Sequence, residues 1–135
     1  MEYNVILLLS PDRRQVLMCR RQKPPFQGLM NLVGGKIRPG EDHLDAAYRE
    51  LWEETSICRQ DVDLAYLMRL SYPREDWILE AYGGTLKHSA AVSGEENPLL
   101  WVDVLEDFTD ETRFAGLGNL QHILQYYQSM TAQGD

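Results

Sequence analysis

The sequence predicts a single α/β domain in which a mixed β-sheet lies between helices. Three observations support this fold class. The chain has 135 residues, 44% of them hydrophobic and 25% charged, which suits one compact domain with a buried core. Segments with strand character outnumber segments with helical character. The two helical segments also lie far apart in the chain, so that each can cover one face of the sheet.

The strands are predicted from short apolar and β-branched runs that turn residues interrupt. Ser10-Pro11-Asp12 is the first such turn, and the two prolines of Lys23–Gly28 predict a loop because proline has no backbone donor. Gly34-Gly35 is expected to end the third strand. The predicted strands are Glu2–Leu9, Gln15–Arg20, Asn31–Val33, Asp63–Ser71, Trp77–Gly83 and Leu99–Val102.

Two segments have the apolar spacing of amphipathic helices. In His43–Thr55 the apolar positions recur every three or four residues, and Asp42 can cap the helix start. A second helix is predicted from about residue 117 to residue 129. The residues expected to face the core are Leu44, Ala47, Tyr48 and Leu51 in the first helix, and Leu117, Leu120, Ile123, Leu124 and Tyr127 in the second.

Composition narrows the classes of function. No apolar run reaches the roughly 18–20 residues that span a bilayer, and Val5–Leu9 lacks the preceding basic residues of a signal peptide. Cys19 and Cys58 have neither CxxC spacing nor histidine companions, so reduced thiols in the cytoplasm are expected. The formal charge of −8 argues against broad nucleic-acid binding. Five basic residues lie close together early in the chain, and a solvated turn and a substrate contact are equally good interpretations of them. They are Arg13, Arg14, Arg20, Arg21 and Lys23.

A cluster of three glutamates in the first predicted helix indicates a site for a divalent cation. Glu50, Glu53 and Glu54 lie three or four residues apart, so their carboxylates share one side of the helix. Like charges repel there, and Arg49 is expected to neutralise only one of them. Mg²⁺ commonly joins such carboxylates to substrate phosphates, so a magnesium site is expected.

The segment from Gly35 to Ile57 resembles the signature of the Nudix hydrolases. Glycine is followed after five residues by Glu41 and after seven more by Arg49-Glu50-Leu51, then by Glu53-Glu54 and Ile57. Ser56 stands where the family usually has glycine, in the turn after the helix. The resemblance implies an α/β/α sandwich and a pyrophosphohydrolase that uses Mg²⁺, for which Mn²⁺ can substitute.

The resemblance also implies roles for individual residues. Glu53, Glu54 and the carbonyl oxygen of Gly34 would bind the metal directly, and Glu50 would be a further ligand or the base that deprotonates water. Arg49 would hold one glutamate in place, and Glu41 would contact Arg49 or orient the loop. A late acid would complete the metal site, and Glu95 is preferred to its neighbour Glu96.

The stretch Arg20–Asn31 resembles the MutT-type branch, which removes oxidised purine nucleotides. The expected substrate is therefore a purine nucleoside triphosphate, including oxidised forms, cleaved to monophosphate and pyrophosphate. Asn31 would read the base or close a turn, and Asn119 would cap the last helix or face the base. Phosphate or base contacts are also expected from Arg20, Lys23, Gly35 and Lys36.

Three alternatives stay open: ADP-ribose as substrate, a dinucleoside polyphosphate, and a catalytically silent nucleotide sensor. We expect a small nucleotide as partner and neither nucleic acid nor a membrane. Whether the chain is a monomer or a homodimer is left open. The scattered histidines His43, His88 and His122 are interpreted as surface residues.

Overall fold

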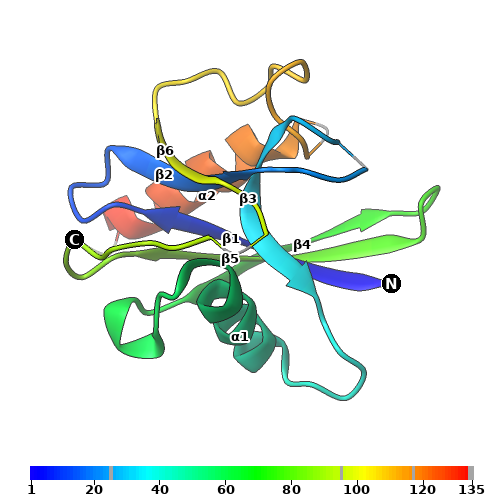
Figure 1. Cartoon of the computed structure of the whole chain (residues 1–135), viewed down its shortest axis with the longest axis horizontal. Helices are drawn as coiled ribbons and strands as arrows, with labels where there is room; N and C mark the ends of the chain where they lie inside the picture. The colour runs from blue at the N-terminus through cyan, green and yellow to red at the C-terminus, as the bar shows by residue number, and fades with distance from the viewer. Residues whose placement is uncertain (25, 95, 117, 134–135) are drawn as a thin grey trace.

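The computed structural model describes residues 1–24, 26–94, 96–116 and 118–133 and has the layers of an α/β/α sandwich (Figure 1). A short 3-10 turn, η1 (Arg59–Asp61), follows the first helix. The helices are α1 (His43–Thr55) and α2 (Asn119–Gln133), and the strands are β1 (Glu2–Leu9), β2 (Gln15–Arg20), β3 (Met30–Lys36), β4 (Ala65–Tyr72), β5 (Trp77–Thr85) and β6 (Leu99–Asp103).

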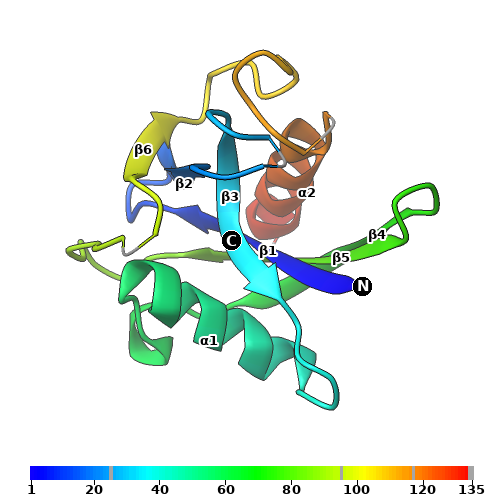
Figure 2. The same cartoon turned by 45° about the vertical axis from the view of Figure 1, so that its right-hand side comes forward.

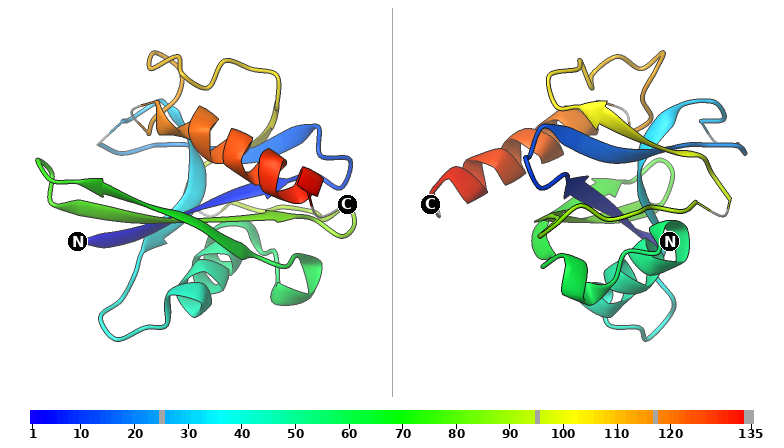
Figure 3. Two further views of the ribbon diagram at one scale, coloured as in Figure 1. Left: turned by 180° about the vertical axis from the view of Figure 1, so that it is seen from behind. Right: turned by 60° about the vertical axis from the view of Figure 1, so that its left-hand side comes forward.

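The strands form one mixed sheet in the order β4-β5-β1-β3-β2-β6. Strand β1 runs parallel to β5 and antiparallel to β3, and the other pairings are antiparallel. Figure 2 shows α1 on one side of this sheet and α2 on the other. The view from behind in Figure 3 shows α2 crossing the opposite face of the sheet from α1. The predicted fold class is confirmed.

Two buried clusters fill the two layers, and β1 contributes to both because successive side chains of a strand point to opposite faces. Val5, Leu7 and Leu9 of β1 join the cluster under α2. Ile6 and Leu8 join the cluster under α1. Strand β1 is therefore the centre of the core. The predicted buried residues of α2 that the structure describes are confirmed, namely Leu120, Ile123, Leu124 and Tyr127; Leu117 lies outside the described residues.

The predicted end of the third strand at Gly34-Gly35 was wrong, because β3 continues to Lys36. Gly34 and Gly35 pair with Val5 and Asn4 of β1. Gly34 has φ +150°, and a Cβ on it would lie 2.1 Å from the backbone oxygen of Asn4. These glycines thus remain in the ladder, where a side chain on Gly34 would collide with the neighbouring strand.

Helix α1 begins and ends as its sequence predicts. The Asp42 side chain accepts a hydrogen bond from the Asp45 amide at 3.0 Å, which confirms the cap. Ser56 adopts the left-handed conformation, with φ 67°, and its amide donates to the Trp52 carbonyl at 2.8 Å. Serine therefore forms the turn in which the family usually has glycine, at the conformational cost of a non-glycine residue with positive φ.

The predicted buried face of α1 needs one correction. Ala47 and Leu51 are fully buried and Tyr48 is half-buried, but Leu44 is 37% exposed. Ala46 is buried in its place, since the covered part of the helix begins one turn after its start. Elsewhere the boundaries moved by a few residues: β4 begins at Ala65, β5 continues to Thr85 and α2 continues to Gln133. In the described residues no helix is long and apolar enough to cross a bilayer.

Candidate active site

The two glycines of β3 allow the carboxylates of α1 to approach the strand. The Gly34 amide donates to Glu54 Oε2 at 3.1 Å. A Cβ on Gly35 would lie 2.4 Å from Glu50 Oε2, so the Glu50 carboxylate rests against this glycine. Glu50 and Glu54 thus point toward the sheet at the edge of the buried face, and Glu53 is 43% exposed. The three glutamates share one side of α1, as predicted, and differ in burial.

Arg49 contacts more carboxylates than the single one that its sequence position suggests. Its guanidinium donates to both oxygens of Glu41, at 2.7 and 2.9 Å. The same side chain donates to Glu50 at 2.9 Å, to Glu53 at 3.2 Å and to the Lys36 carbonyl at 3.2 Å. Arg49 remains a single positive charge beside three helix glutamates, as expected, but it bonds to two of them. It connects the loop after β3 to these two glutamates, and the predicted contact with Glu41 is present.

The charges around these groups shift their pKa values in different directions. Hydrogen bonds from Arg49 lower the pKa of Glu41 to about 2, and the same pair raises the pKa of Arg49. Burial raises the pKa of Glu54 to about 7, against the hydrogen bond from Gly34, and the charges of Glu50 and Glu96 add to the rise. Burial also raises the pKa of Glu50, which the bond from Arg49 opposes. Burial thus disfavours the charged forms of Glu50 and Glu54, whereas the pair with Arg49 favours the charged form of Glu41.

A polar pocket of about 560 Å³ lies over these carboxylates. Glu96 lines it, whereas Glu95, the predicted late acid, lies outside the described residues. The lining fits a hard divalent cation, because it brings together the carboxylates of Glu50, Glu53 and Glu54, and burial disfavours the charged form of Glu54. The residues around this acidic pocket are Cys19, Gly34, Gly35, Lys36, Glu50, Glu53, Glu54, Glu96, Asn97 and Leu99.

A second, mainly apolar pocket of about 290 Å³ adjoins the acidic pocket. The two pockets share Cys19, Gly34, Gly35, Glu54 and Asn97. The apolar walls come from β1, β3, β4, β5 and α2, and four asparagine side chains, an arginine and four aromatic residues also contribute. These further lining residues include Leu70, Leu79, Leu120, Ile123, Asn4, Asn31, Asn119, Arg21, Tyr72 and Trp77. One ligand can therefore contact both pockets, with a flat apolar part in one and an anionic part in the other.

The structure separates the predicted substrate residues into two groups. Asn31 and Asn119 line the apolar pocket. The Asn31 Oδ1 accepts from the Leu32 amide at 2.8 Å, so its Nδ2 is the atom left to meet a ligand. The Asn119 Nδ2 donates to the Tyr72 hydroxyl. Asn119 is also the first residue of α2, so its position tests neither its expected capping role nor its expected contact with the base.

The other residues that were expected to contact the substrate do not line the apolar pocket through their side chains. Gly35 and Lys36 line the acidic pocket. Arg20 is exposed, and its Nη1 donates to the Gly28 carbonyl at 3.0 Å, which stabilises the loop before β3. Lys23 is exposed in that loop and lines neither pocket.

The sequence analysis did not assign Tyr72 or Trp77 to the site, whereas Arg21, which lines the apolar pocket, belongs to the basic cluster for which a substrate contact was one of two interpretations. Tyr72 ends β4 and Trp77 begins β5, and their rings meet edge to face with centroids 6.4 Å apart. The available signal was the position of two aromatic residues at the ends of one predicted hairpin, where cross-strand partners meet.

An α/β/α sandwich whose acidic helix lies beside two adjoining pockets fits one class of protein. This class is the hydrolases that cleave phosphate anhydrides with a divalent cation. The family model described as the NUDIX domain matches residues 2–116. The chain belongs to the Nudix family, as its signature segment predicted.

Three proteins illustrate what this chain is similar to. The 8-oxo-dGDP phosphatase NUDT18 of Mus musculus is 28% identical over 101 residues, which cover 73% of this chain and 31% of the mouse protein. The chain thus spans about a third of that relative's length. A C. elegans Ap4A hydrolase shares the fold with a TM-score of 0.79 and 16% identity, covering 97% of this chain and 98% of that structure. A MutT protein from Methanosarcina mazei has a TM-score of 0.72 and 18% identity, covering 97% and 94%.

Proposed function

We propose that this protein is a Mg²⁺-dependent pyrophosphohydrolase that converts purine nucleoside triphosphates, including oxidised ones, to the monophosphate and pyrophosphate. The observation that carries the proposal is the pair of adjoining pockets, one acidic and one apolar with amide groups. The acidic pocket suits the phosphates with their cation, and the apolar pocket suits a base. Such a division of one ligand between two environments is typical of nucleotide sites.

Glu53, Glu54 and the carbonyl oxygen of Gly34 would hold the cation, with Glu50 and a late acid nearby. Mg²⁺ or Mn²⁺, when bound, supplies polarisation of the phosphate oxygens and neutralises charge that develops on them. Glu50 either completes the ligand set or accepts the proton of the attacking water. The water oxygen forms a bond to the α-phosphorus, and its proton passes to Glu50 or, where Glu50 is a ligand, to bulk water. The bond from the α-phosphorus to the bridging oxygen breaks, and pyrophosphate leaves. Lys36, on the wall of the same pocket, can pair with a phosphate.

Arg49 has a positioning role in this scheme. It contacts Glu41, Glu50, Glu53 and the Lys36 carbonyl, so it sets the orientation of the carboxylates without facing the substrate itself. Five donors in a rigid plane suit this task, and lysine could not replace them.

The apolar pocket supports a purine as the base. Tyr72 and Trp77 offer ring surfaces, and Asn31 and Asn119 offer amide groups that pair with base edges. The resemblance to a mouse protein that is named an 8-oxo-dGDP phosphatase favours an oxidised guanine among the purines. We also propose a cytoplasmic location, since both Cys19 and Cys58 are free thiols.

The test is a product assay on a panel of nucleotides with Mg²⁺ and with EDTA. We expect the highest kcat/KM for a purine triphosphate or its 8-oxo form, pyrophosphate as product and no turnover in EDTA. The panel includes 8-oxo-dGDP, ADP-ribose, a dinucleoside tetraphosphate and pyrimidine triphosphates. Faster cleavage of ADP-ribose or of the tetraphosphate would overturn the substrate assignment and leave the hydrolase chemistry intact. Tight nucleotide binding with no turnover of any compound would indicate a sensor.

A further inference from the structure

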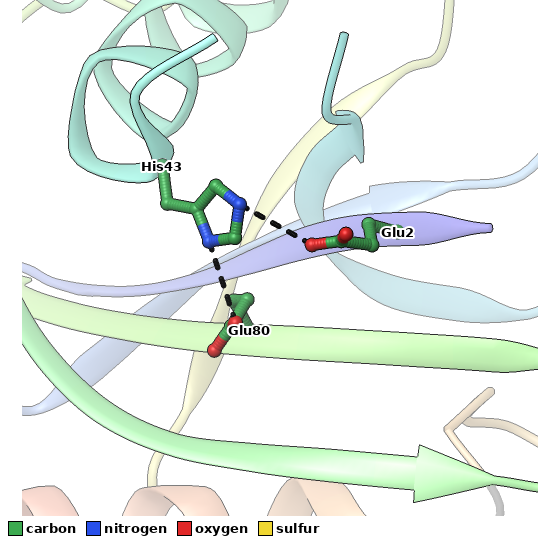
Figure 4. A group of neighbouring side chains, drawn as sticks. All are labelled: Glu2, His43 and Glu80. Carbon is green, nitrogen blue, oxygen red and sulfur yellow. Dashed lines mark ion pairs between the residues drawn. The ribbon is translucent and has the colours of Figure 1, made fainter. Parts of the chain in front are cut away.

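A second group of potential metal ligands lies at the start of α1, away from the acidic pocket. Glu2 of β1, His43 at the first position of α1 and Glu80 of β5 converge there, and one ligand atom from each lies within 4.8 Å of the others. Figure 4 shows the imidazole between the two carboxylates. His43 Nε2 is 3.2 Å from Glu2 Oε2, and Nδ1 is 3.4 Å from Glu80 Oε1. His43 precedes Glu50 by seven residues, a rise of about 10 Å along the helix.

The burial of Glu80 is the second observation that points to a cation. Its side chain is 8% exposed, and its Oε2 has no hydrogen-bond partner among the described residues. A buried carboxylate is costly unless it is paired or coordinates a metal. In the described part of the chain its one ion pair is with His43, which Glu2 shares. One imidazole thus faces two carboxylates.

The surrounding charges do not remove this excess. Arg69 lies opposite Glu80 in the β4–β5 register but is exposed, and the described residues form no ion pair between them. Tyr66 contributes a hydroxyl group that interacts with Glu80. Asp42, next to His43, adds a further negative charge that reaches Tyr82 beneath the helix. The neighbourhood thus has a net deficit of positive charge close to one imidazole and two carboxylates.

Asn4 supports the Glu80 carboxylate from the adjacent strand. It is 1% exposed and pairs with Glu80 in the parallel β1–β5 register, so the two side chains share a face. Its Oδ1 accepts from the Gly35 amide at 3.0 Å, which fixes the amide orientation, and its Nδ2 has no partner among the described residues. A hydrogen bond from Nδ2 to Glu80 Oε2 would leave Oε1 for a metal. A hydrogen bond to the second oxygen of a ligating carboxylate is the usual support of a metal site.

We propose that Glu2, His43 and Glu80 form a binding site for a borderline first-row divalent cation such as Zn²⁺, separate from the catalytic metal. One imidazole nitrogen with two carboxylate oxygens is a donor set that suits Zn²⁺ better than Mg²⁺, and a water completes four-coordination. The ligand atoms must approach one another by about 1 Å for metal–ligand bonds near 2.1 Å. The Glu2 and His43 side chains are 44% and 41% exposed and can make this movement. The ion would join β1, β5 and α1.

The experiment is titration of the full-length protein with Zn²⁺ by calorimetry and thermal unfolding, in a large excess of Mg²⁺ that occupies the acidic pocket. We expect one Zn²⁺ site whose occupation raises Tm. Glu2→Gln and His43→Ala should each weaken it by about tenfold or more. His122→Ala, which alters an exposed histidine of α2, and Glu54→Gln, in the acidic pocket, are the matched controls and should retain it.

Three results would overturn the proposal: no Zn²⁺ binding above the Mg²⁺ background, binding unchanged in His43→Ala, or binding lost in Glu54→Gln. Glu80→Gln is a stricter variant because the side chain is buried, and the two variants at partly exposed positions keep the test valid if Glu80→Gln does not fold. Hydrolysis has no part in the readout, so failure of the proposed enzymatic function does not affect this test.

Discussion

The Glu54→Gln variant tests the charge of the acidic pocket through stability alone. Burial raises the pKa of Glu54 from 4.5 to about 7 in the folded protein. A group whose folded pKa is raised binds more protons when folded, so the metal-free protein should lose stability as the pH rises from about 4.5 through 7. One pKa unit corresponds to about 1.4 kcal/mol, so ionised Glu54 costs about 3 kcal/mol above this range. Between about pH 5 and pH 8 the loss is about 2 kcal/mol.

Glutamine keeps an oxygen that can accept from Gly34 and removes the charge. In EDTA, Glu54→Gln should therefore exceed the wild type in Tm by roughly 5–10 °C at about pH 8 and by much less at about pH 5. Saturating Mg²⁺ should stabilise the wild type more than the variant and reduce this gap. Glu53→Gln is the control, because Glu53 is 43% exposed and solvent screens its charge. The reasoning fails if the wild type and Glu54→Gln have parallel stability curves over this pH range, or if Mg²⁺ stabilises both equally.

Further outcomes follow from the same geometry. Steady-state assays should find that EDTA abolishes activity and that Mg²⁺ or Mn²⁺ restores it. Glu53→Gln should lower activity by about a hundredfold or more and leave the circular dichroism spectrum unchanged. Wild-type rates in this variant would remove Glu53 from the site. Asn31→Ala should lower kcat/KM about tenfold or more for the preferred purine and much less for a pyrimidine triphosphate, whereas equal losses would assign Asn31 to the loop. Gly34→Ala should lower the free energy of unfolding by about 3 kcal/mol or more, because its Cβ would collide with the backbone of β1. Denaturant unfolding measures this loss. Gly35→Ala meets only the end of Glu50, so it should fold and lose activity.

The shared side of the three glutamates could be predicted from the sequence because these residues come from one continuous segment. Helical spacing places Glu50, Glu53 and Glu54 on one side without any knowledge of the fold. Spacing did not predict that Arg49 contacts Glu41, Glu50 and Glu53 together, because that depends on how the loop after β3 folds back onto α1. Nor could it predict the exposure of Leu44, because a helical pattern shows which side faces the sheet and not where along the axis the sheet begins to cover it.

The apolar pocket was harder to predict because its walls come from separate parts of the chain. Tyr72, Trp77 and Asn119 are brought together by the β4–β5 hairpin and α2. Their pattern in the sequence is that of ordinary core residues, and only the packing of α2 across the sheet leaves a cavity between them. Site chemistry and substrate preference therefore differ in how far the sequence alone predicts them.

Strand β3 lines both the acidic pocket and the apolar pocket. Asn31 and Leu32 near its start line the apolar pocket, Gly34 and Gly35 form part of the wall that both pockets share, and Lys36 at its end lines the acidic pocket. From Asn31 to Lys36 the strand rises about 17 Å. A nucleotide that follows β3 would have its base at one end and its phosphates at the other, with the two glycines between. A shift of β3 against β1 would then displace the amide that meets the base and the glycines that meet Glu50 and Glu54 together. Base preference and catalysis are therefore expected to respond jointly to changes at the β1–β3 pairing, and separately to changes in β4, β5 or α2.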